Sequence, residues 1–447
     1  MVWLMSDYDT YDAIVVGGGI SGLLSALTLG KKGNSVLLLE KANVLGGNCR
    51  TYEPPDCPGW RVDTGVHAIT GLIYGPLKQL NHYFDPGKFP TFRQHTNYYL
   101  RKKDGLEKFP STLPGFLKMD SLPAKDKMIL GGCLINTVIS HAIFGEKQKA
   151  VYDAISKHRL SKKTMQFMDA LSYLLSGLSM KKTSVSRLLE GCGFSSGGKR
   201  GIFRRIAEIA NLFNNIGYRS QGYPLGGIQS ITDGVITSFP KNVEYHTREE
   251  VRKIEQVESG FCVSTLETDY FSDKVVYSGE VKKLPGIIEM PVEWSQQVKK
   301  LEQATAMTIW LGLKTPMTEF NYNGSEVFCD VCDTDKELFY WLMPVPELAP
   351  RNKGLIGVST IIDPKKCHDS KEKLLNTIYS LVPALEKNIE MIHTQVMAPE
   401  KAAVSLNYFP SIKTPVKGLY VVGTDTDMRS MGITRAGYSV LELLKSL

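Results

Sequence analysis

The first fifty residues combine two short apolar runs with one helical pattern. Residues 11–16 are mainly apolar and are typical of a buried parallel strand. After a glycine-rich turn, apolar residues recur at helical spacing up to Leu29, and Lys31-Lys32-Gly33 then provides the basic residues and glycine that are common at helix ends. A second apolar run, residues 35–39, ends at Glu40. The pattern predicts a strand–helix–strand unit.

The rest of the chain shows both periodicities. Residues 89–217 are expected to be mainly helical, with helices over 124–144, 147–156, 163–178 and 202–213. Residues 286–394 mix both types, with helices over 292–303 and 371–381 and strands over 304–313 and 354–361. The remaining predicted elements are helices over 229–239 and 434–445 and strands over 242–246, 250–254 and 418–425.

Size and composition indicate a globular chain of two or three domains. Its 447 residues are 43% hydrophobic and 22% charged. The net charge of +7 is scattered and forms no basic tail, so no nucleic-acid partner is expected. Eight irregularly spaced cysteines do not form a disulfide framework, and Met1–Asp12 lacks the order of a signal peptide. A reducing, cytoplasmic setting is expected.

No run of about 20 apolar residues exists, so no membrane-spanning helix is expected. The closest segment is Met128–Gly145, which contains Asn136 and His141. Two interpretations stay open for it. It is either a buried or interface helix, or a helix that touches a membrane surface or lines a lipid tunnel.

The glycine-rich turn has the spacing of a dinucleotide site. Gly17 permits the tight turn out of the strand, Gly19 lets a pyrophosphate approach the backbone, and Gly22 lets the helix pack close to the sheet. The start of the helix offers free N–H groups and a positive dipole end to phosphate. Glu40, at the tip of the second strand, is placed to accept hydrogen bonds from ribose hydroxyls and to repel a 2′-phosphate, which argues against NADP.

The residues after Glu40 distinguish FAD from NAD. A loop containing Lys41 leads to Gly46-Gly47-Asn48, and residues 60–67 end in Asp63-Thr64-Gly65-Val66-His67. These motifs resemble the flavoprotein superfamily of amine oxidases, protoporphyrinogen oxidases and phytoene desaturases. In that superfamily the Gly-Gly loop folds over the pyrophosphate, and the D-x-G-x-H element runs beside the flavin ring. Asn48 departs from the arginine that is common there, and Gly-Gly-Asn also occurs in UDP-galactopyranose mutases.

Two later blocks extend the resemblance. Residues 223–228 (YPLGGI) resemble the superfamily's P-x-G-G helix start, and Val251 matches the position whose backbone meets the adenine. Residues 418–425 resemble the strand whose final aspartate, here Asp425, bonds the ribityl chain, and the helix after Gly432 would point its N-terminus at the flavin. The resemblance implies an α/β fold, with a discontinuous Rossmann-type FAD-binding domain (1–88, 218–285 and 395–447) and a helix-rich α+β substrate domain (89–217 and 286–394).

The implied FAD site is a set of loop and helix-start residues from all three blocks. They are Gly17, Gly19, Ile20, Ser21, Gly22, Glu40, Lys41, Gly46, Gly47, Asn48, Gly65, Val66, His67, Val251, Gly423, Asp425, Gly432 and Ile433. The covalent flavin–cysteine link of amine oxidases uses a cysteine near the C-terminus, and residues 418–447 contain none. The FAD is therefore expected to be non-covalent.

Few side chains stand out as candidates for chemistry. His67 could act as an acid or base beside the flavin or could orient its loop, and Arg429 or Arg435, near Asp427, could anchor a carboxylate or the flavin. Cys329 and Cys332 form a C-x-x-C without a second pair or zinc-spaced histidines, so no metal site is expected. In flavin dehydrogenation the cofactor takes the hydride, and the protein positions the substrate.

Residues 305–313 (TAMTIWLGL) resemble a strand of phytoene-desaturase-like enzymes. The resemblance implies desaturation, saturation or isomerisation of C–C bonds in an apolar, isoprenoid-like small molecule, with an electron acceptor or donor that the sequence does not identify. Such a substrate makes a peripheral membrane contact compatible with the sequence. The alternatives are a flavin amine oxidase with an aromatic cage, a non-redox flavoprotein of the UDP-galactopyranose mutase type with arginines facing a diphosphate, and a catalytically inactive FAD binder.

Overall fold

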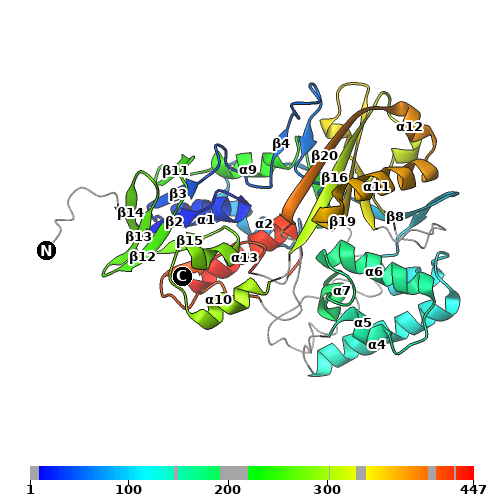
Figure 1. Cartoon of the computed structure of the whole chain (residues 1–447), viewed down its shortest axis with the longest axis horizontal. Coiled ribbons are helices and arrows are strands. Elements are labelled where there is room, and N and C mark those ends of the chain that lie inside the picture. The colour runs from blue at the N-terminus through cyan, green and yellow to red at the C-terminus, as the bar shows by residue number, and fades with distance from the viewer. Residues whose placement is uncertain are drawn as a thin grey trace.

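A five-stranded parallel sheet forms one half of the molecule (Figure 1). The computed structural model describes residues 10–144, 149–191, 220–301, 303–328, 339–400, 409–426 and 429–447. The sheet has the order β11-β3-β2-β15-β21, and all its neighbours are parallel. Its strands are β2 (Ala13–Val16), β3 (Val36–Glu40), β11 (Val243–Thr247), β15 (Val275–Tyr277) and β21 (Leu419–Val421). The central strands are buried on both faces, which explains why β2 and β3 are almost entirely apolar.

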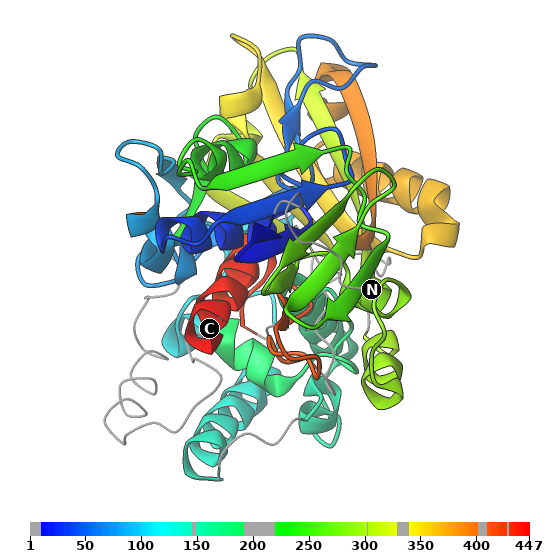
Figure 2. The same cartoon turned by 90° about the vertical axis from the view of Figure 1, so that its left-hand side faces the viewer.

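Different layers cover the two faces of this sheet. Helices α1 (Ile20–Lys31), α9 (Gln229–Ile236) and α13 (Gly432–Ser446) pack with one face in a shared core that includes Leu24 and Val440. The other face shares a core with a four-stranded sheet, in the order β1-β14-β13-β12, and with α10 (Val292–Lys299). The strands of that smaller sheet are β1 (Thr10–Tyr11), β12 (Lys253–Val257), β13 (Gly260–Ser264) and β14 (Asp269–Ser272). Figure 2 shows it to the right of α13.

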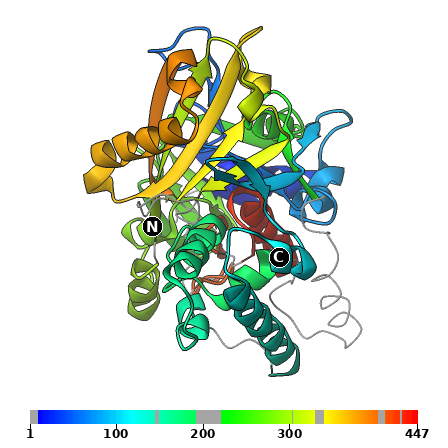
Figure 3. The ribbon, with the colours of Figure 1, turned by 90° about the vertical axis from the view of Figure 1, so that its right-hand side faces the viewer.

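The second half is built on a seven-stranded sheet with the order β20-β16-β19-β18-β17-β8-β9 (Figure 3). Its strands are β8 (Asn97–Lys102), β9 (Gly105–Lys108), β16 (Ala304–Leu313), β17 (Gly324–Phe328), β18 (Tyr340–Pro344), β19 (Gly354–Ile362) and β20 (Ile389–Glu400). Every second residue of β16, from Met307 to Leu313, enters the core that packs against the helices. Those helices are α3 (Leu113–Lys118), α4 (Ala124–Phe144), α5 (Val151–Ile155), α6 (Lys162–Ser176), α7 (Val185–Gly191), α11 (Cys367–Leu381) and α12 (Ala384–Asn388).

Short elements join the halves. The sheet β6-β10-β7 comprises β6 (Ile69–Thr70), β7 (Phe92–Gln94) and β10 (Gln221–Pro224), and β4 (Thr51–Tyr52) pairs with β5 (Val62–Asp63). The helical segments before β7 are α2 (Pro76–Leu80) and the 3-10 helix η1 (Asn81–Tyr83). Within the described residues, no helix is both long enough and apolar enough to cross a bilayer.

The predicted fold class is confirmed, and so are the predicted bounds of α4 and β16. Residues 92–108 were wrongly included in a mainly helical region, because β8 and β9 mix polar and aromatic residues without a clear period. The helix expected over 147–156 is described only over Val151–Ile155, since Ala150 is extended and bridges Ser184. The strand expected over 250–254 begins at Lys253. The helix expected over 202–213 lies outside the described residues, and the domain division stays a prediction.

Candidate functional site

The glycine-rich turn joins β2 to α1 in an anion-binding geometry. Gly17 has a φ of +106°, and a Cβ on Gly22 would lie 1.9 Å from the Gly17 carbonyl oxygen, so the helix packs against the turn only with glycine there. Gly19 caps α1 without a side-chain hydrogen bond, and the first helical turn carries no acid. A Cβ on Gly19 would meet no protein atom within 4 Å. The first N–H groups of α1, those of Ile20 and Ser21, are therefore available to an anion that approaches past Gly19.

Glu40 and the Gly-Gly loop close over this turn. The Glu40 carboxylate accepts hydrogen bonds from the Gly18 amide at 2.6 Å and the Ala42 amide at 2.7 Å. Gly46 forms an isolated parallel β-bridge with Gly19. Gly46 and Gly47 have φ values of +114° and +57°. Lys41 and Asn48 are exposed beside them. These residues fit a dinucleotide, because an uncapped helix start with free space at Gly19 lies next to a carboxylate fixed by backbone amides.

The segment that contains Val251 returns to the end of β3, where Glu40 lies. The Glu249 amide donates to the Glu40 carbonyl at 2.9 Å, and the Arg248 amide donates to the Ala42 carbonyl at 2.8 Å. Arg248 has a φ of +61°, which turns the chain before β12. Val251 is buried in the core beneath this turn. The structure therefore brings Val251 close to the Glu40 loop, although its expected contact with adenine stays a prediction.

The C-terminal block meets the start of α1. An ideal Cβ on Gly423 would lie 3.5 Å from the Ser21 hydroxyl oxygen, and the Gly423 amide donates to the Ser439 hydroxyl at 2.9 Å. Asp425 accepts a hydrogen bond from the Val281 amide at 3.2 Å. Gly432 begins α13, which has no capping side chain, and Ile433 is buried. Two uncapped helix starts therefore come from opposite ends of the chain, and the turn that follows β21 lies beside one of them.

Asp63 anchors the D-x-G-x-H element in the interior. Its fully buried carboxylate accepts hydrogen bonds from the Thr51 hydroxyl, the Tyr223 hydroxyl and the Ile228 amide, at 2.6, 2.6 and 3.1 Å. Burial is the largest influence on the Asp63 pKa and raises it, and the hydrogen bonds oppose that rise. The same residue's carbonyl accepts from Trp310 Nε1 and Gln395 Nε2. Asp63 thereby fixes the residues that follow it.

Gly65, Val66 and His67 are held against the large sheet. The Gly65 amide donates to Gln395 Oε1 at 2.9 Å, and Val66 is buried. His67 Nε2 lies 2.7 Å from the Thr64 carbonyl oxygen, an arrangement in which the ring donates to its own loop. This hydrogen bond supports an orienting role, and the role of His67 as an acid or base stays a prediction.

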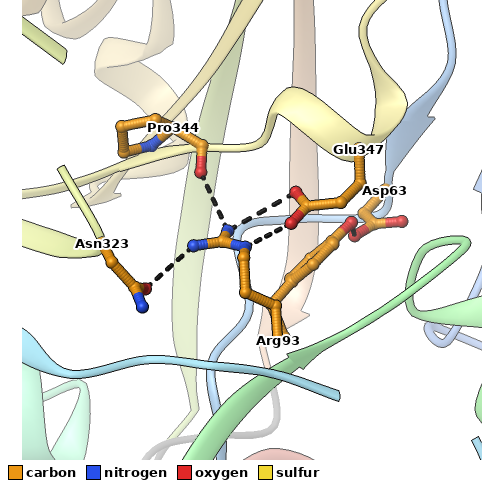
Figure 4. Close-up of polar contacts among 6 residues, drawn as sticks. Asp63, Arg93, Asn323, Pro344 and Glu347 are labelled. Carbon is orange, nitrogen blue, oxygen red and sulfur yellow. Dashed lines mark hydrogen bonds and ion pairs between the residues drawn. The ribbon is translucent and has the colours of Figure 1, made fainter. Parts of the chain in front are cut away.

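A polar network behind Asp63 links the sheets (Figure 4). Arg93 forms an ion pair with Glu347, donates to Asn323 Oδ1 at 3.0 Å and reaches the Pro344 carbonyl. Its guanidinium carbon lies 5.9 Å from the centre of the Tyr223 ring, whose hydroxyl donates to Asp63. Arg93 and Glu347 could not be predicted from the sequence, since no local pattern connects a strand at position 93 with a short 3-10 helix at 347.

The two candidate arginines hold the loop before α13. Arg429 pairs with Glu442 at 3.1 Å, and its guanidinium carbon lies 4.2 Å from the centre of the Tyr438 ring. Arg435 is fully buried and donates to the carbonyls of Ser430 and Thr424. These contacts support a structural role, while a catalytic role for Arg429 stays a prediction. Asp427, Cys329 and Cys332 lie outside the described residues.

Comparison with known proteins places this geometry in a family. The model of the flavin containing amine oxidoreductases matches residues 20–436. Among curated proteins, the chain is 50% identical over 101 residues to an uncharacterized protein in the nifH2 3′ region of Methanothermococcus thermolithotrophicus, covering 22% of this chain and 92% of that protein. A crystal structure of an oxidoreductase from Methanosarcina mazei has a TM-score of 0.75 at 18% identity, over 97% of this chain and 99% of that one.

Several curated relatives have named reactions, among them a carotenoid desaturase and a retinol reductase. The chain is 25% identical over 334 residues to a 1-hydroxycarotenoid 3,4-desaturase of Flavobacterium sp. (strain P99-3), covering 68% of this chain and 63% of that protein. It is 47% identical over 66 residues to the all-trans-retinol 13,14-reductase of Rattus norvegicus, covering 15% of this chain and 10% of that protein. The chain thus spans less than two thirds of each of these two enzymes. The family match, which implies a flavin cofactor, shows that the chain belongs to the flavin-containing amine oxidoreductases.

Proposed function

We propose that this FAD-dependent oxidoreductase desaturates, saturates or isomerises C–C bonds in an apolar, isoprenoid-like substrate. The similarity to the carotenoid desaturase supports the proposal because it extends over 68% of the chain. The shorter similarity to a retinol reductase points to the same class of molecule, a conjugated isoprenoid. The substrate is therefore expected to be long, apolar and uncharged along its reacting part.

The Met397 side chain, which lies beside Gly65, is the main structural support for the proposal. Met397 Cε lies 2.9 Å from the position that a Cβ on Gly65 would take, and Met397 pairs with Ala306 between β20 and β16. Val66, the next residue, packs against the backbone of Gly357 on β19. Besides the polar His67 and Gln395, the described neighbours of this loop thus include a flexible thioether and small apolar groups, which suit an apolar chain better than an ammonium or a diphosphate.

The residues of the chain serve mainly to position and to stabilise charge. Bound FAD supplies the two-electron chemistry, with hydride gained or lost at its N5 atom. The uncapped starts of α1 and α13 favour negative charge, as phosphate at one helix and on the reduced ring at the other. Asp63 and Gln395 hold the Gly65 backbone rigid from behind. Asp425 is held by the Val281 amide beside the second helix start.

Anaerobic flavin spectroscopy tests the proposal. The purified protein, loaded with FAD, is mixed with polyprenoid and carotenoid substrates in detergent, and in separate samples with polyamines. Oxidised flavin is expected to bleach with the polyene precursors, or dithionite-reduced flavin to reoxidise with the unsaturated products, and chromatography identifies the changed bond. Bleaching by amines alone would overturn the proposal. Turnover of a UDP-sugar by the reduced protein, without net oxidation, would overturn it as well.

A matched pair of variants on β20 sharpens this test. Met397→Glu places a carboxylate beside Gly65 and is expected to lower kcat/KM for the polyene at least about tenfold, or about 1.4 kcal/mol. Val396→Glu changes the adjacent residue, which is 46% exposed, and should leave kcat/KM unchanged. Flavin content must stay equal in both variants. Equal loss of activity in the two would count against substrate contact at position 397.

We also propose that the half of the protein that contains α3 and α4 contacts membrane surfaces. Met128 and Ile135 are 68% and 41% exposed on one face of α4, and Leu117 on the adjoining α3 is 37% exposed. Lys118 and Lys125 are exposed close to them in the chain. Apolar side chains flanked by lysines favour the interface of an anionic bilayer, where an isoprenoid substrate would be dissolved.

A further inference from the structure

A cluster of metal-ligand side chains lies where the loop between β4 and β5 meets β20. Asp56, Cys57 and His393 each present one ligand atom, and the three atoms lie within 4.8 Å of one another. Asp56 Oδ1 and His393 Nδ1 are 3.2 Å apart. Figure 1 shows β4 beside β20 at the edge of the large sheet, away from the start of α1.

His393 is oriented as a metal-binding histidine would be. Its Nδ1 atom is buried and has no hydrogen bond of acceptable geometry to any residue that the structure describes. Its Nε2 atom lies 3.1 Å from the Tyr52 hydroxyl. When Nε2 carries the proton and donates it to Tyr52, Nδ1 presents a free lone pair toward Asp56 and Cys57. Histidine ligands in metal sites are usually fixed through their second nitrogen in this way.

The loop that carries the other two ligands is held by its own contacts. The Cys57 amide donates to the Pro54 carbonyl at 3.0 Å, and the Gly59 amide donates to the Glu53 carboxylate at 3.0 Å. Pro54, Pro55 and Pro58 further restrict its backbone. Cys57 is a free thiol of intermediate exposure. The backbone that carries these two ligands is therefore ordered before an ion binds, while the Asp56 side chain is 65% exposed.

We infer that Asp56, Cys57 and His393 form a Zn²⁺ site with a fourth position open to water. A thiolate, an imidazole and a carboxylate are the three ligand types that zinc accepts, whereas Ca²⁺ and Mg²⁺ take oxygen ligands only. Bond lengths of about 2.0–2.3 Å in a tetrahedron place ligand atoms roughly 3.3–3.8 Å apart. The ligand atoms of the present cluster lie within 4.8 Å of one another, so side-chain rotations that shorten the longer separations would complete that geometry.

The site is connected to the flavin-side loop by hydrogen bonds. The Tyr52 hydroxyl accepts from Gln395 Nε2 at 2.8 Å, and Gln395 also contacts the Asp63 carbonyl and the Gly65 amide. Zinc at His393 therefore steadies Tyr52 and Gln395 and, through them, the segment from Asp63 to Gly65. This inference needs the fold alone and does not depend on which substrate the flavin oxidises or reduces.

Metal titration of the FAD-loaded protein tests the inference. After removal of metal by a chelator and dialysis, Zn²⁺ binding is measured by calorimetry and by elemental analysis. One Zn²⁺ per chain is expected. Tyr52→Phe should weaken binding about 10–100-fold, as the loss of such an outer partner does, and Cys57→Ser and His393→Gln should weaken it further. Added Zn²⁺ should raise the Tm of the wild type and leave that of Cys57→Ser unchanged.

Control variants separate this site from adventitious binding. Cys262→Ser removes another free, half-buried thiol, and His368→Gln removes an exposed histidine, so both should bind Zn²⁺ as the wild type does. The double change Cys329→Ser and Cys332→Ser should also leave binding intact. Co²⁺ gives a second measurement, since its tetrahedral d–d absorption lies beyond the flavin bands and should collapse in Cys57→Ser. No uptake by the wild type, or equal uptake in Cys57→Ser and His393→Gln, would overturn the inference.

Discussion

Tyr223 donates a 2.6 Å hydrogen bond to the Asp63 carboxylate from 160 residues further along the chain. Both residues are almost fully buried, at 1% and 0% exposure. The bond ties the D-x-G-x-H element to β10, and the Arg93 guanidinium carbon lies 5.9 Å from the centre of the Tyr223 ring. Asp63 therefore holds the flavin-side loop in place from the interior.

Asp63→Ala is expected to lower the free energy of unfolding by about 3–5 kcal/mol. Three buried donors would lose their acceptor, at about 1–3 kcal/mol each before relaxation. Tyr223→Phe removes one of the three hydrogen bonds and should cost only about 1 kcal/mol. Urea denaturation of the FAD-free proteins measures both values. Equal losses in the two variants would show that the carboxylate is not the centre of the network.

Gly19→Ala should separate cofactor binding from folding. Its Cβ meets no protein atom within 4 Å, so the free energy of unfolding should stay within about 0.5 kcal/mol of the wild type. The added methyl narrows the approach to α1, and the FAD dissociation constant, measured by fluorescence titration, should rise at least about tenfold.

Gly132→Ala is the matched control, because its Cβ in α4 is equally unobstructed. This variant should bind FAD as tightly as the wild type and be at least as stable, since alanine is favoured over glycine within a helix. Unchanged FAD affinity in Gly19→Ala would contradict the placement of the pyrophosphate.

His95 should make the protein less stable in mild acid. The ring is 1% exposed, and burial, helped by Arg93, lowers its pKa from 6.5 to about 4. Above pH 6.5 the histidine is neutral in both the folded and the unfolded chain. As the pH falls from 6.5 toward 4, only the unfolded chain takes up the proton, so stability falls by about 3 kcal/mol across that interval.

Comparison with His95→Gln isolates this contribution. The glutamine can still hydrogen-bond to Ser325, which lies 2.7 Å from His95 Nε2, but it does not titrate. Unfolding in urea at pH 7.5 and pH 5 should show a smaller loss of stability for the variant than for the wild type. The same slope in both proteins would place the acid sensitivity at other groups.

Arg101→Met should destabilise the large sheet strongly. Arg101 Nε donates to Glu326 at 2.6 Å between β8 and β17, and the Glu326 side chain is 0% exposed. Loss of the arginine leaves a buried carboxylate that still accepts a hydrogen bond from the Tyr322 hydroxyl, at a cost of about 3–5 kcal/mol. Lys31→Met breaks the exposed pair with Asp85 and should cost no more than about 1 kcal/mol. Thermal and urea unfolding distinguish the two outcomes.

The double variant Met128→Glu/Ile135→Glu should reduce binding to anionic vesicles. Two apolar side chains that enter the interface contribute about 1.5–3 kcal/mol each when fully buried, so even partial insertion predicts at least about a tenfold loss. Leu266→Glu, at a residue 79% exposed between β13 and β14, is the control and should sediment with vesicles as the wild type does. No difference between the variants would exclude α4 as the contact.

The sequence alone determined the dinucleotide unit. Gly17, Gly19, Gly22 and Glu40 lie within one strand–helix–strand segment, where hydrophobic periodicity and glycine spacing specify the local backbone directly. The same reasoning predicted α4 and β16, whose apolar patterns are long enough to be unambiguous. The three-block order of the FAD domain followed from resemblance rather than from periodicity.

Only the tertiary structure decided which distant side chains meet. β8 was not predicted because its residues show no clear period. It is a strand because it pairs with β17, more than two hundred residues later in the chain. The Asp63–Tyr223 bond, the Arg93–Glu347 pair and the Asp56–Cys57–His393 cluster likewise join segments that lie far apart in the sequence. Local propensity specifies the backbone of each element, whereas these contacts depend on how separate elements pack, and that is set by the burial of the whole core.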